Sequence, residues 1–358
     1  MAALRAAALA ASFTAAAPFT AAAAAPFTAA HLSQTSTLSA SKLSLLVGDV
    51  SGVDAPVAAF LATTRPRTLK LLDPRDGWAA AAKRASPETL LVGRLWTPTQ
   101  PTDGDPRVAA ASWLNASCAA IAASPEITHW EGYNELPGTA TNRSLMRWYA
   151  AFETERVSLL AAVGLRAVVG SFATSDMEDL SNETSTFADF VPAARAAAAA
   201  GGLLGLHVYS SPLMWTCFDN ATGVGRETGR YRTLYGSFFS ASPPPPAPPV
   251  PPPPPPLLLS EVGVGWAAPS CGGTGAVLGW RAYCANWTAP GWVFPGMACE
   301  DAFVAQLAWY DALLRADAFV VGANIFCESC GSFESFDTAP ALGALAAYMG
   351  GVRAEDHY

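Results

Sequence analysis

Short apolar runs alternate with alanine-rich, helix-forming segments along the chain from residue 40 onward. The runs that we predict as strands are Leu43–Asp49, Thr68–Asp73, Thr89–Trp96, Ile127–Asn134, Arg166–Phe172, Leu203–Tyr209, Leu257–Gly263 and Val320–Phe326. The segments that we predict as helices are Pro56–Thr63, Trp78–Arg84, Pro106–Ala123, Leu145–Val163, Phe187–Ala200, Arg230–Phe239 and Ala302–Ala316. Continuously apolar runs are typical of parallel strands that are covered on both faces, and parallel strands need long crossover connections.

This alternation predicts the α/β class and, because eight strands span roughly 310 residues, a single (β/α)8 TIM barrel with long βα loops. An open, doubly wound sheet is the alternative, and it should carry a ligand-binding fingerprint where the strand order reverses. The segment 263–268 has the G-x-G-x-x-A spacing of such a fingerprint. Trp266 is too bulky for this motif, and Pro269 with the glycines that follow predicts a loop where the fingerprint needs a helix.

The sequence divides into an alanine-rich segment over residues 1–40 and a barrel over residues 41–352. The first segment resembles a secretory leader, and a disordered tail or an organelle transit peptide are the alternatives. Within the barrel, residues 243–256 hold 12 prolines in 14 positions and predict an extended polyproline segment. We expect it to be a solvent-exposed spacer, and a ligand for a proline-binding domain is the alternative.

Asparagine and cysteine usage indicates the secretory pathway. Five of the seven asparagines stand in N-x-Ser/Thr sequons, where about one would be expected by chance. They are Asn115, Asn142, Asn182, Asn220 and Asn286. The seven cysteines leave at least one unpaired, and their connectivity cannot be derived from spacing. We therefore expect a glycoprotein with a signal peptide that is secreted or reaches the cell surface.

Charge and motif content exclude several classes of function. The net charge of −8 without a basic stripe argues against nucleic-acid binding. The four histidines are scattered, so no metal site is predicted. The sequence holds no G-x-S-x-G, P-loop or H-E-x-x-H motif, and its apolar stretches are too interrupted for a transmembrane span. We also expect a monomer that needs no cofactor.

Polar residues at the carboxyl ends of the predicted strands are the candidate site, because catalytic groups of parallel barrels lie there. Two glutamates, Glu135 after the fourth strand and Glu261 on the seventh, should face each other across the barrel mouth. A pair of carboxylates is the machinery of glycoside hydrolysis, whereas either glutamate alone would more often be an ion-pair partner. The other candidates for substrate binding are Asn134, Arg94, His207, Tyr209, Trp266 and Trp96.

These residues resemble clan A of the retaining glycoside hydrolases. The stretch Trp130–Pro137 is similar to the W-E-x-x-N-E-P of its cellulase-like members, although Leu136 separates Glu135 from the proline. The resemblance implies that Glu135 is the acid/base and Glu261 the nucleophile. It also implies that Asn134 binds the sugar 2-hydroxyl and that Tyr209 hydrogen-bonds Glu261.

Two features depart from the pattern of the clan. Arg94 would be the arginine beside the nucleophile, but it stands on the third predicted strand, and Lys70 occupies the second. The aromatic residue that normally follows strand eight would have to be Phe326 or Phe333. Trp96, Trp215 and Trp266 lie at or just beyond strand ends, where flat rings could stack on sugars.

The sequence as a whole thus predicts a retaining O-glycosyl hydrolase that acts on a β-linked oligo- or polysaccharide. A secreted, non-catalytic carbohydrate-binding or wall-associated glycoprotein on a barrel scaffold is the alternative. The carboxylate pair separates the two, since a protein that only binds sugar has no need of both Glu135 and Glu261.

Overall fold

The computed structural model describes residues 38–48, 50–174, 185–240, 253–265, 271 and 277–352. Eight parallel strands close into a barrel in the order β1-β10-β9-β6-β5-β4-β3-β2. They are β1 (Leu43–Val47), β2 (Thr68–Leu72), β3 (Leu90–Arg94), β4 (His129–Glu131), β5 (Arg166–Phe172), β6 (Leu203–Ser210), β9 (Leu257–Val264) and β10 (Val320–Glu328). The predicted (β/α)8 barrel is thereby confirmed. The open sheet is excluded because each of the eight strands pairs with a neighbour on both sides, which leaves no edge strand.

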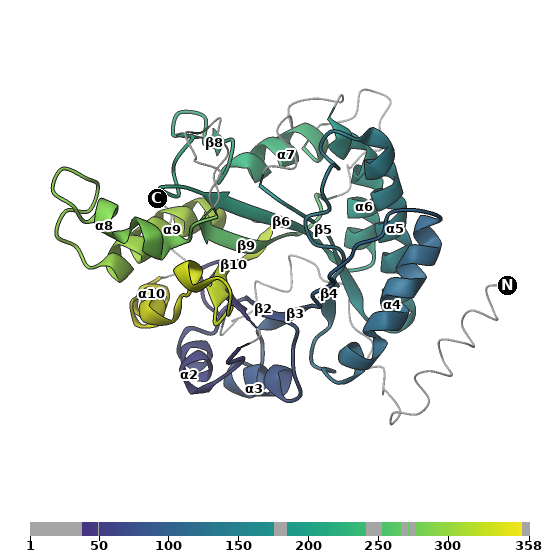
Figure 1. Ribbon diagram of the computed structural model, residues 1–358, viewed down its shortest axis with the longest axis horizontal. Coiled ribbons are helices and arrows are strands. Elements are labelled where there is room, and N and C mark those ends of the chain that lie inside the picture. The colour runs from purple at the N-terminus through teal and green to yellow at the C-terminus, as the bar shows by residue number, and fades with distance from the viewer. Residues whose placement is uncertain are drawn as a thin grey trace.

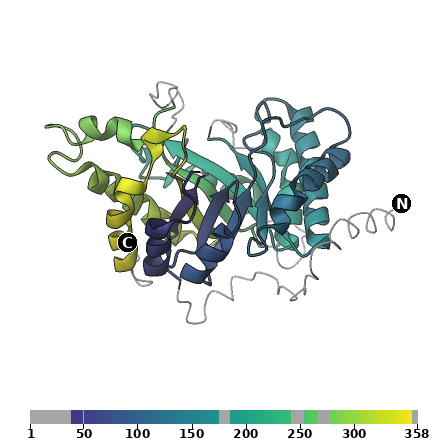
Figure 2. The ribbon, with the colours of Figure 1, turned by 60° about the horizontal axis from the view of Figure 1, so that its bottom comes forward.

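Helices surround the strands on the outside of the barrel (Figures 1 and 2). They are α2 (Ala55–Thr64), α3 (Trp78–Ala85), α4 (Pro106–Ala122), α5 (Arg143–Ala162), α6 (Val191–Ala199), α7 (Arg230–Phe238), α8 (Cys284–Trp287), α9 (Cys299–Ala316) and α10 (Leu342–Gly351). Short 3-10 turns are η2 (Thr186–Asp189), η4 (Trp280–Tyr283), η5 (Glu334–Phe336) and η6 (Ala339–Ala341). Three helices begin where an acidic or amide side chain caps a backbone N–H: Asp54, Asp105 and Asn142.

The barrel interior is filled with side chains. Val92, Val168, Leu203, Leu258 and Val321 form one buried cluster. They come from β3, β5, β6, β9 and β10, and strands as far apart in the barrel as β3 and β9 can share a cluster only across its interior. The interior is therefore a packed core and not an open channel.

Three disulfides join the cysteines: Cys217–Cys271, Cys284–Cys299 and Cys327–Cys330. Cys118 on α4 is free. The second bridge closes the loop between α8 and α9, and the third ties the end of β10 to the loop that follows it. All three lie in the second half of the chain, where the βα loops are longest.

Several sequence predictions differ in detail or fall outside the described residues. The fourth strand was predicted as Ile127–Asn134, but β4 is only His129–Glu131, because the chain then leaves the sheet and Glu135 adopts a left-handed φ of 46°. A two-stranded pair, β7 (Phe218–Asp219) with β8 (Val224–Gly225), was not anticipated. Residues 1–37 of the predicted leader and 243–252 of the polyproline segment are not among the described residues.

No helix in the described part of the chain is long and apolar enough to cross a bilayer.

Candidate active site

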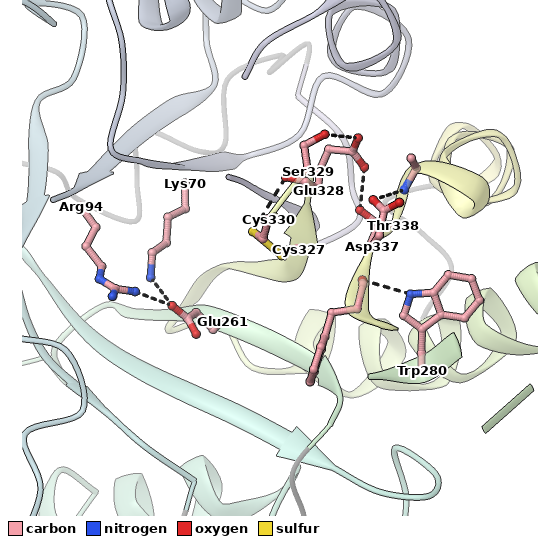
Figure 3. Close-up of a disulfide and its surroundings, with 12 residues drawn as sticks. Lys70, Arg94, Glu261, Trp280, Cys327, Glu328, Ser329, Cys330, Asp337 and Thr338 are labelled. Atoms are coloured by element: carbon pink, nitrogen blue, oxygen red, sulfur yellow. Dashed lines mark hydrogen bonds and ion pairs between the residues drawn. A yellow bond between two sulfur atoms is a disulfide. The ribbon is translucent and has the colours of Figure 1, made fainter. Parts of the chain in front are cut away.

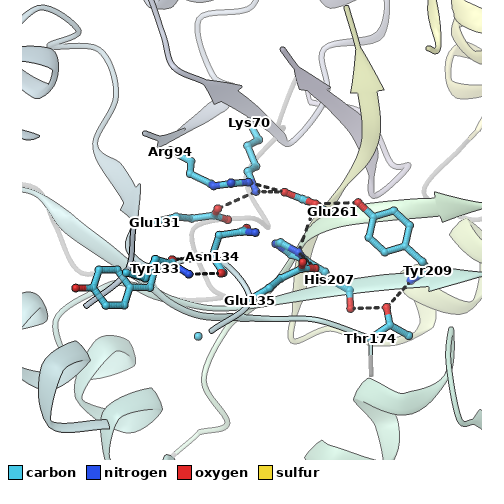
Figure 4. A network of polar contacts seen from close by, with 12 residues as sticks. Lys70, Arg94, Glu131, Tyr133, Asn134, Glu135, Thr174, His207, Tyr209 and Glu261 are labelled. Atoms are coloured by element: carbon cyan, nitrogen blue, oxygen red, sulfur yellow. Dashed lines mark hydrogen bonds and ion pairs between the residues drawn. The ribbon is translucent and has the colours of Figure 1, made fainter. Parts of the chain in front are cut away.

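Glu261 is the centre of a buried polar network at the mouth of the barrel (Figure 4). It lies on β9, and its side chain is only 6% exposed. Its Oε1 is 2.9 Å from Lys70 Nζ and 3.0 Å from Arg94 Nη1. Its Oε2 accepts a hydrogen bond of 2.8 Å from the hydroxyl of Tyr209. Both carboxylate oxygens are thus held by charged or hydroxyl donors from three other strands.

These contacts decide the charge of Glu261. Burial by itself favours the neutral acid, but the positive charges of His207, Lys70 and Arg94 outweigh it and hold the pKa of Glu261 well below its usual range. The pKa of Tyr209 is raised far above its ordinary value by burial and by the neighbouring negative charge of Glu261. Tyr209 therefore stays a neutral hydroxyl that donates to an ionised carboxylate.

Lys70 also binds a second carboxylate. Its Nζ lies 2.7 Å from Oε2 of Glu131, and both side chains have no exposed surface. Burial would raise the pKa of Glu131, but Lys70, His207 and Arg94 lower it below its usual value. Glu131 is thus an ionised partner that shares Lys70 with Glu261.

Glu135 lies on the loop after β4, on the other side of His207 from Glu261. Its backbone N–H donates to the carbonyl of Ser171 at 3.0 Å, which anchors the left-handed residue to the end of β5. The residue before it is also clamped: Gln100 Nε2 donates 2.8 Å to the carbonyl of Asn134, and Gln100 Oε1 accepts from the Asn134 N–H. The side chain of Glu135 is 35% exposed, in contrast to buried Glu261.

His207 on β6 bridges the two glutamates. Its Nδ1 lies 2.7 Å from Oε1 of Glu135 and 3.3 Å from Oε2 of Glu261. Its Nε2 is buried without a partner among the described residues. One ligand atom from each of these three residues falls within 4.8 Å of the others, as in a metal site. A metal cation there would meet the charges of Lys70 and Arg94, which already neutralise Glu261, so this chemistry is electrostatically disfavoured.

Asn134 contributes a free acceptor next to the two glutamates. Its Oδ1 is buried and has no hydrogen-bond partner among the described residues. In Figure 4 its side chain lies in the midst of Lys70, Glu131 and His207. A buried acceptor without a partner is costly, and a bound hydroxyl group would satisfy it.

A pocket of about 760 Å³ opens above this network. Asn134, Glu135, Tyr209, Glu261 and Arg94 all line it. Trp96 stands at its edge with 60% of its surface exposed, and its backbone N–H donates 2.6 Å to Asp73. Six of the eight predicted site residues therefore line one pocket, and a seventh, His207, contacts two of them, Glu135 and Glu261. The eighth, Trp266, is outside the described residues.

The other aromatic candidates from the sequence are Trp215, Phe326 and Phe333, and two of these three line the pocket. Trp215 packs against Phe294 and Trp309, with ring centroids 6.0 and 5.5 Å away, and does not line the pocket. Phe326 and Phe333, the two candidates for the aromatic residue after strand eight, both line it. Trp215 is thus a packing residue, whereas the two phenylalanines are part of the pocket.

Three residues that support the site were not predicted from the sequence. Lys70 was noticed only as a departure, although it joins Glu131 to Glu261. Gln100 was not considered, because its loop carries no regular pattern. Thr174 accepts from the N–H of Tyr209 at 2.9 Å and donates to the carbonyl of His207 at 3.2 Å. The only feature of the sequence that pointed to Thr174 is its position as a polar residue just after the end of β5, the strand before the one that carries His207 and Tyr209.

The loop after β10 borders the pocket and contains the Cys327–Cys330 disulfide (Figure 3). Cys330 lines the pocket. Glu328, between the two cysteines, is buried, and burial raises the pKa of its carboxyl. It accepts hydrogen bonds from Thr338 at 2.9 Å and from Ser329 at 3.2 Å, so both ends of the loop are held to β10.

No protein-family model and no curated protein sequence matches this chain. Among solved structures it is similar to a family 39 glycoside hydrolase from the gut symbiont Bacteroides cellulosilyticus WH2. That match has a TM-score of 0.50 and 12% identity, and it covers 86% of this chain and 63% of that one. The chain therefore spans less than two thirds of that enzyme. The likeness supports the fold alone, which is the one that the resemblance to clan A implied.

Weaker matches have similar coverage of this chain. A β-glucuronidase from Bacteroides uniformis has a TM-score of 0.44 and 10% identity, over 80% of this chain and 30% of that one. A family 5 xyloglucan-specific endo-β-1,4-glucanase from a metagenomic library has a TM-score of 0.41 and 10% identity, over 87% and 96%. Scores at this level add nothing to the assignment of the fold.

Proposed function

We propose that the protein is a glycoside hydrolase that cleaves β-linked oligo- or polysaccharides with retention of the anomeric configuration. One observation carries this proposal: a buried, ionised Glu261 and a partly exposed Glu135 approach the same histidine nitrogen beneath a pocket. Two carboxylates in unlike environments are what a glycosidase needs, because one must stay charged while the other exchanges a proton.

In the proposed first step the carboxylate of Glu261 attacks the anomeric carbon. The bond from that carbon to the leaving oxygen breaks, and the acid form of Glu135 gives its proton to this oxygen. In the second step the carboxylate of Glu135 takes a proton from water, which displaces Glu261 from the anomeric carbon. Protons and charges balance over the two steps, so no metal or organic cofactor is required.

The short separation of the carboxylates supports retention. One carboxylate oxygen of Glu135 and one of Glu261 lie within 4.8 Å of each other. Carboxyl groups are about 5–5.5 Å apart in retaining enzymes and about 6.5–9.5 Å apart in inverting enzymes, which must hold a water between them. Direct attack by Glu261 suits the shorter spacing.

The surrounding residues have supporting roles in this mechanism. Asn134 would bind the sugar 2-hydroxyl through its unpartnered Oδ1, and Tyr209 and Arg94 would orient Glu261. His207 would donate its Nδ1 proton to Glu135 when that residue is ionised, which favours the carboxylate during the second step. Trp96 would stack on a sugar at the edge of the pocket, and Trp266 is proposed for the same role from sequence alone.

The site of action that we propose is outside the cell or at its surface. Four of the five sequon asparagines are among the described residues, and Asn115, Asn142, Asn220 and Asn286 are all exposed. Glycans could therefore be attached without disturbing the core. The three disulfides are also typical of an oxidising compartment. We propose that the protein is a monomer, since the residues of the candidate site all come from one chain and no second copy is needed to complete it.

The test is hydrolysis of β-glucans, mannans, xylans and aryl β-glycosides by the wild-type protein and by Glu261→Ala, with and without azide. We expect the wild type to cleave at least one member and the variant to be inactive. Azide should restore turnover of an activated aryl glycoside and give a glycosyl azide of inverted configuration. A protein that binds a glycan, cleaves nothing and is unaffected by Glu261→Ala would instead be the non-catalytic binding protein.

A further inference from the structure

One side of the pocket is apolar. The residues that form it come from β2, from β10 with the loop that follows, and from the chain before η4. They are Leu72, Val277, Phe326, Cys330, Phe333 and Phe336, which we call the apolar wall. Among the pocket-lining residues between 326 and 336, Ser332 alone has a side chain that could form a strong hydrogen bond with a hydroxyl group.

The wall is a fixed surface. Phe326, Phe333 and Phe336 pack edge to face in all three pairings, with ring centroids 5.2, 5.4 and 5.9 Å apart. Tyr209, which holds Glu261, packs edge to face on Phe326 at 6.0 Å and on Phe336 at 6.4 Å. The wall is thus continuous with the catalytic network.

Part of the wall is open to solvent. Phe333 is 40% exposed and Val277 is 61% exposed, whereas Phe326 and Phe336 are buried behind them. Exposed apolar surface inside a pocket gains free energy when an apolar group covers it. The same surface offers no strong hydrogen bond to the hydroxyls of a sugar, which lose water on binding and need new partners.

The polar residues of the pocket can serve one sugar. Asn134, Arg94, Tyr209 and Glu261 lie together at the reacting centre, and the sugar that is cleaved must occupy that position. The part of the substrate that reaches the wall is then whatever is attached to this sugar. A second sugar there would leave several hydroxyls without partners.

We propose, on the basis of the proposed function, that among the β-glycosides which this site cleaves the preferred substrate carries an apolar aglycone, such as an aryl or long-chain alkyl group. The apolar wall binds this aglycone, and the polar residues bind one sugar. The pocket then selects glycosides of apolar alcohols over oligosaccharides of the same sugar.

The test measures binding of 1-thio-β-glycosides, which are not hydrolysed, by calorimetry. The series is methyl, hexyl and phenyl thioglycosides and a thio-linked disaccharide, each on glucose, galactose, mannose and xylose. The wild type is compared with Phe333→Ala. Trp292→Ala is the matched control, because Trp292 is similarly exposed, at 43%, but lies in the loop between α8 and α9 and does not line the pocket.

For the best sugar, we expect the hexyl and phenyl compounds to bind the wild type at least about tenfold more tightly than the methyl compound. Phe333→Ala should lose about fivefold in affinity for both and leave methyl binding unchanged, while Trp292→Ala changes neither. Equal binding of methyl and hexyl compounds, tighter binding of the disaccharide, or no binding of any member would overturn the proposal. So would an equal loss for methyl and hexyl compounds in Phe333→Ala.

The two proposals fail separately. Aglycone-dependent binding without cleavage of the corresponding oxygen glycosides would contradict the hydrolase function and leave the apolar wall as a binding site. Cleavage of β-glycosides at rates that do not depend on the aglycone would support the hydrolase and contradict the role of the wall.

Discussion

The ammonium group of Lys70 lies 2.7 Å from the carboxylate of Glu131, and neither side chain has any exposed surface. The same ammonium is 2.9 Å from Glu261. One lysine therefore forms ion pairs with two buried carboxylates, from β4 and β9, across the interior of the barrel. Together with Arg94 it explains how Glu261 stays ionised although it is buried.

Removal of Lys70 tests this arrangement. Lys70→Met should lower the free energy of unfolding by about 3–5 kcal/mol, because it leaves a buried charge without a partner. The double variant Lys70→Met/Glu131→Gln removes the stranded charge as well and should recover part of this loss. Urea denaturation of both variants measures the difference. Equal destabilisation of the two variants would contradict the ion pair as the cause.

Tyr209→Phe removes one hydrogen bond from Glu261 and leaves the ring packing in place. A hydrogen bond to a charged group is worth about 1.5–3 kcal/mol, so kcat/KM should fall about 10- to 100-fold. Loss of this donor also raises the pKa of Glu261, which moves the acidic limb of the pH profile of kcat/KM to higher pH. Tyr235→Phe is the control, since Tyr235 donates 2.6 Å to the carbonyl of Pro255 away from the pocket. If both variants kept full activity, Tyr209 would have no role in orienting the nucleophile.

His129 on β4 makes stability depend on pH. Burial lowers the pKa of His129 from 6.5 to about 4, and its ring contacts the Thr128 hydroxyl at 2.9 Å and the Gly201 carbonyl at 3.2 Å. The folded protein prefers the neutral ring while the unfolded chain binds a proton near pH 6.5. Protonation of His129 therefore leaves the free energy of unfolding unchanged above pH 6.5 and lowers it as the pH falls from 6.5 towards 4.

The loss amounts to about 3 kcal/mol between neutral pH and pH 4. Denaturation at a series of pH values should show that His129→Gln is less sensitive to acid than the wild type by this amount. Parallel stability curves for the two proteins would show that His129 does not titrate as described.

The disulfides predict the number of reactive thiols. Protein unfolded without reductant should show one thiol, from Cys118, and seven after reduction. Titration with a thiol reagent measures both values. Three thiols before reduction would mean that one pair, with Cys327–Cys330 the most accessible from the pocket, is reduced in the purified protein.

The fold could be predicted because its signal is local and repeated. Continuous apolar strands and alanine-rich helices recur along the chain, and parallel strands with crossover helices allow few architectures. The end of the fourth strand could not be placed, because the stretch from Trp130 to Glu135 remains favourable for a strand. The backbone leaves the sheet there through contacts of Asn134 with Gln100 and of Glu135 with Ser171. Gln100 lies on another loop and Ser171 lies at the end of β5, so both partners are distant in the sequence.

Part of the candidate site could also be predicted, because it follows from the topology of the barrel. Glu135 and Glu261 meet because the carboxyl ends of all strands gather at one face, so their approach follows from topology alone. Pairing of Lys70 with Glu131 depends instead on register: Lys70 aligns with Val92, and Val92 aligns with His129, two residues before Glu131. No pattern in a single sequence encodes that register. The apolar wall likewise combines residues of β2 and β10 with residues of two loop segments whose paths only the folded chain defines.

The most direct test of the central claim is to trap the covalent intermediate on Glu261. The wild-type protein is treated with the 2-deoxy-2-fluoro 2,4-dinitrophenyl β-glycoside of a sugar that it cleaves, and the labelled peptide is identified by mass spectrometry. We predict one glycosyl group per chain, attached to Glu261, and no label in Glu261→Gln. A label on another residue, or continued turnover of the natural glycoside in Glu261→Gln, would contradict the account.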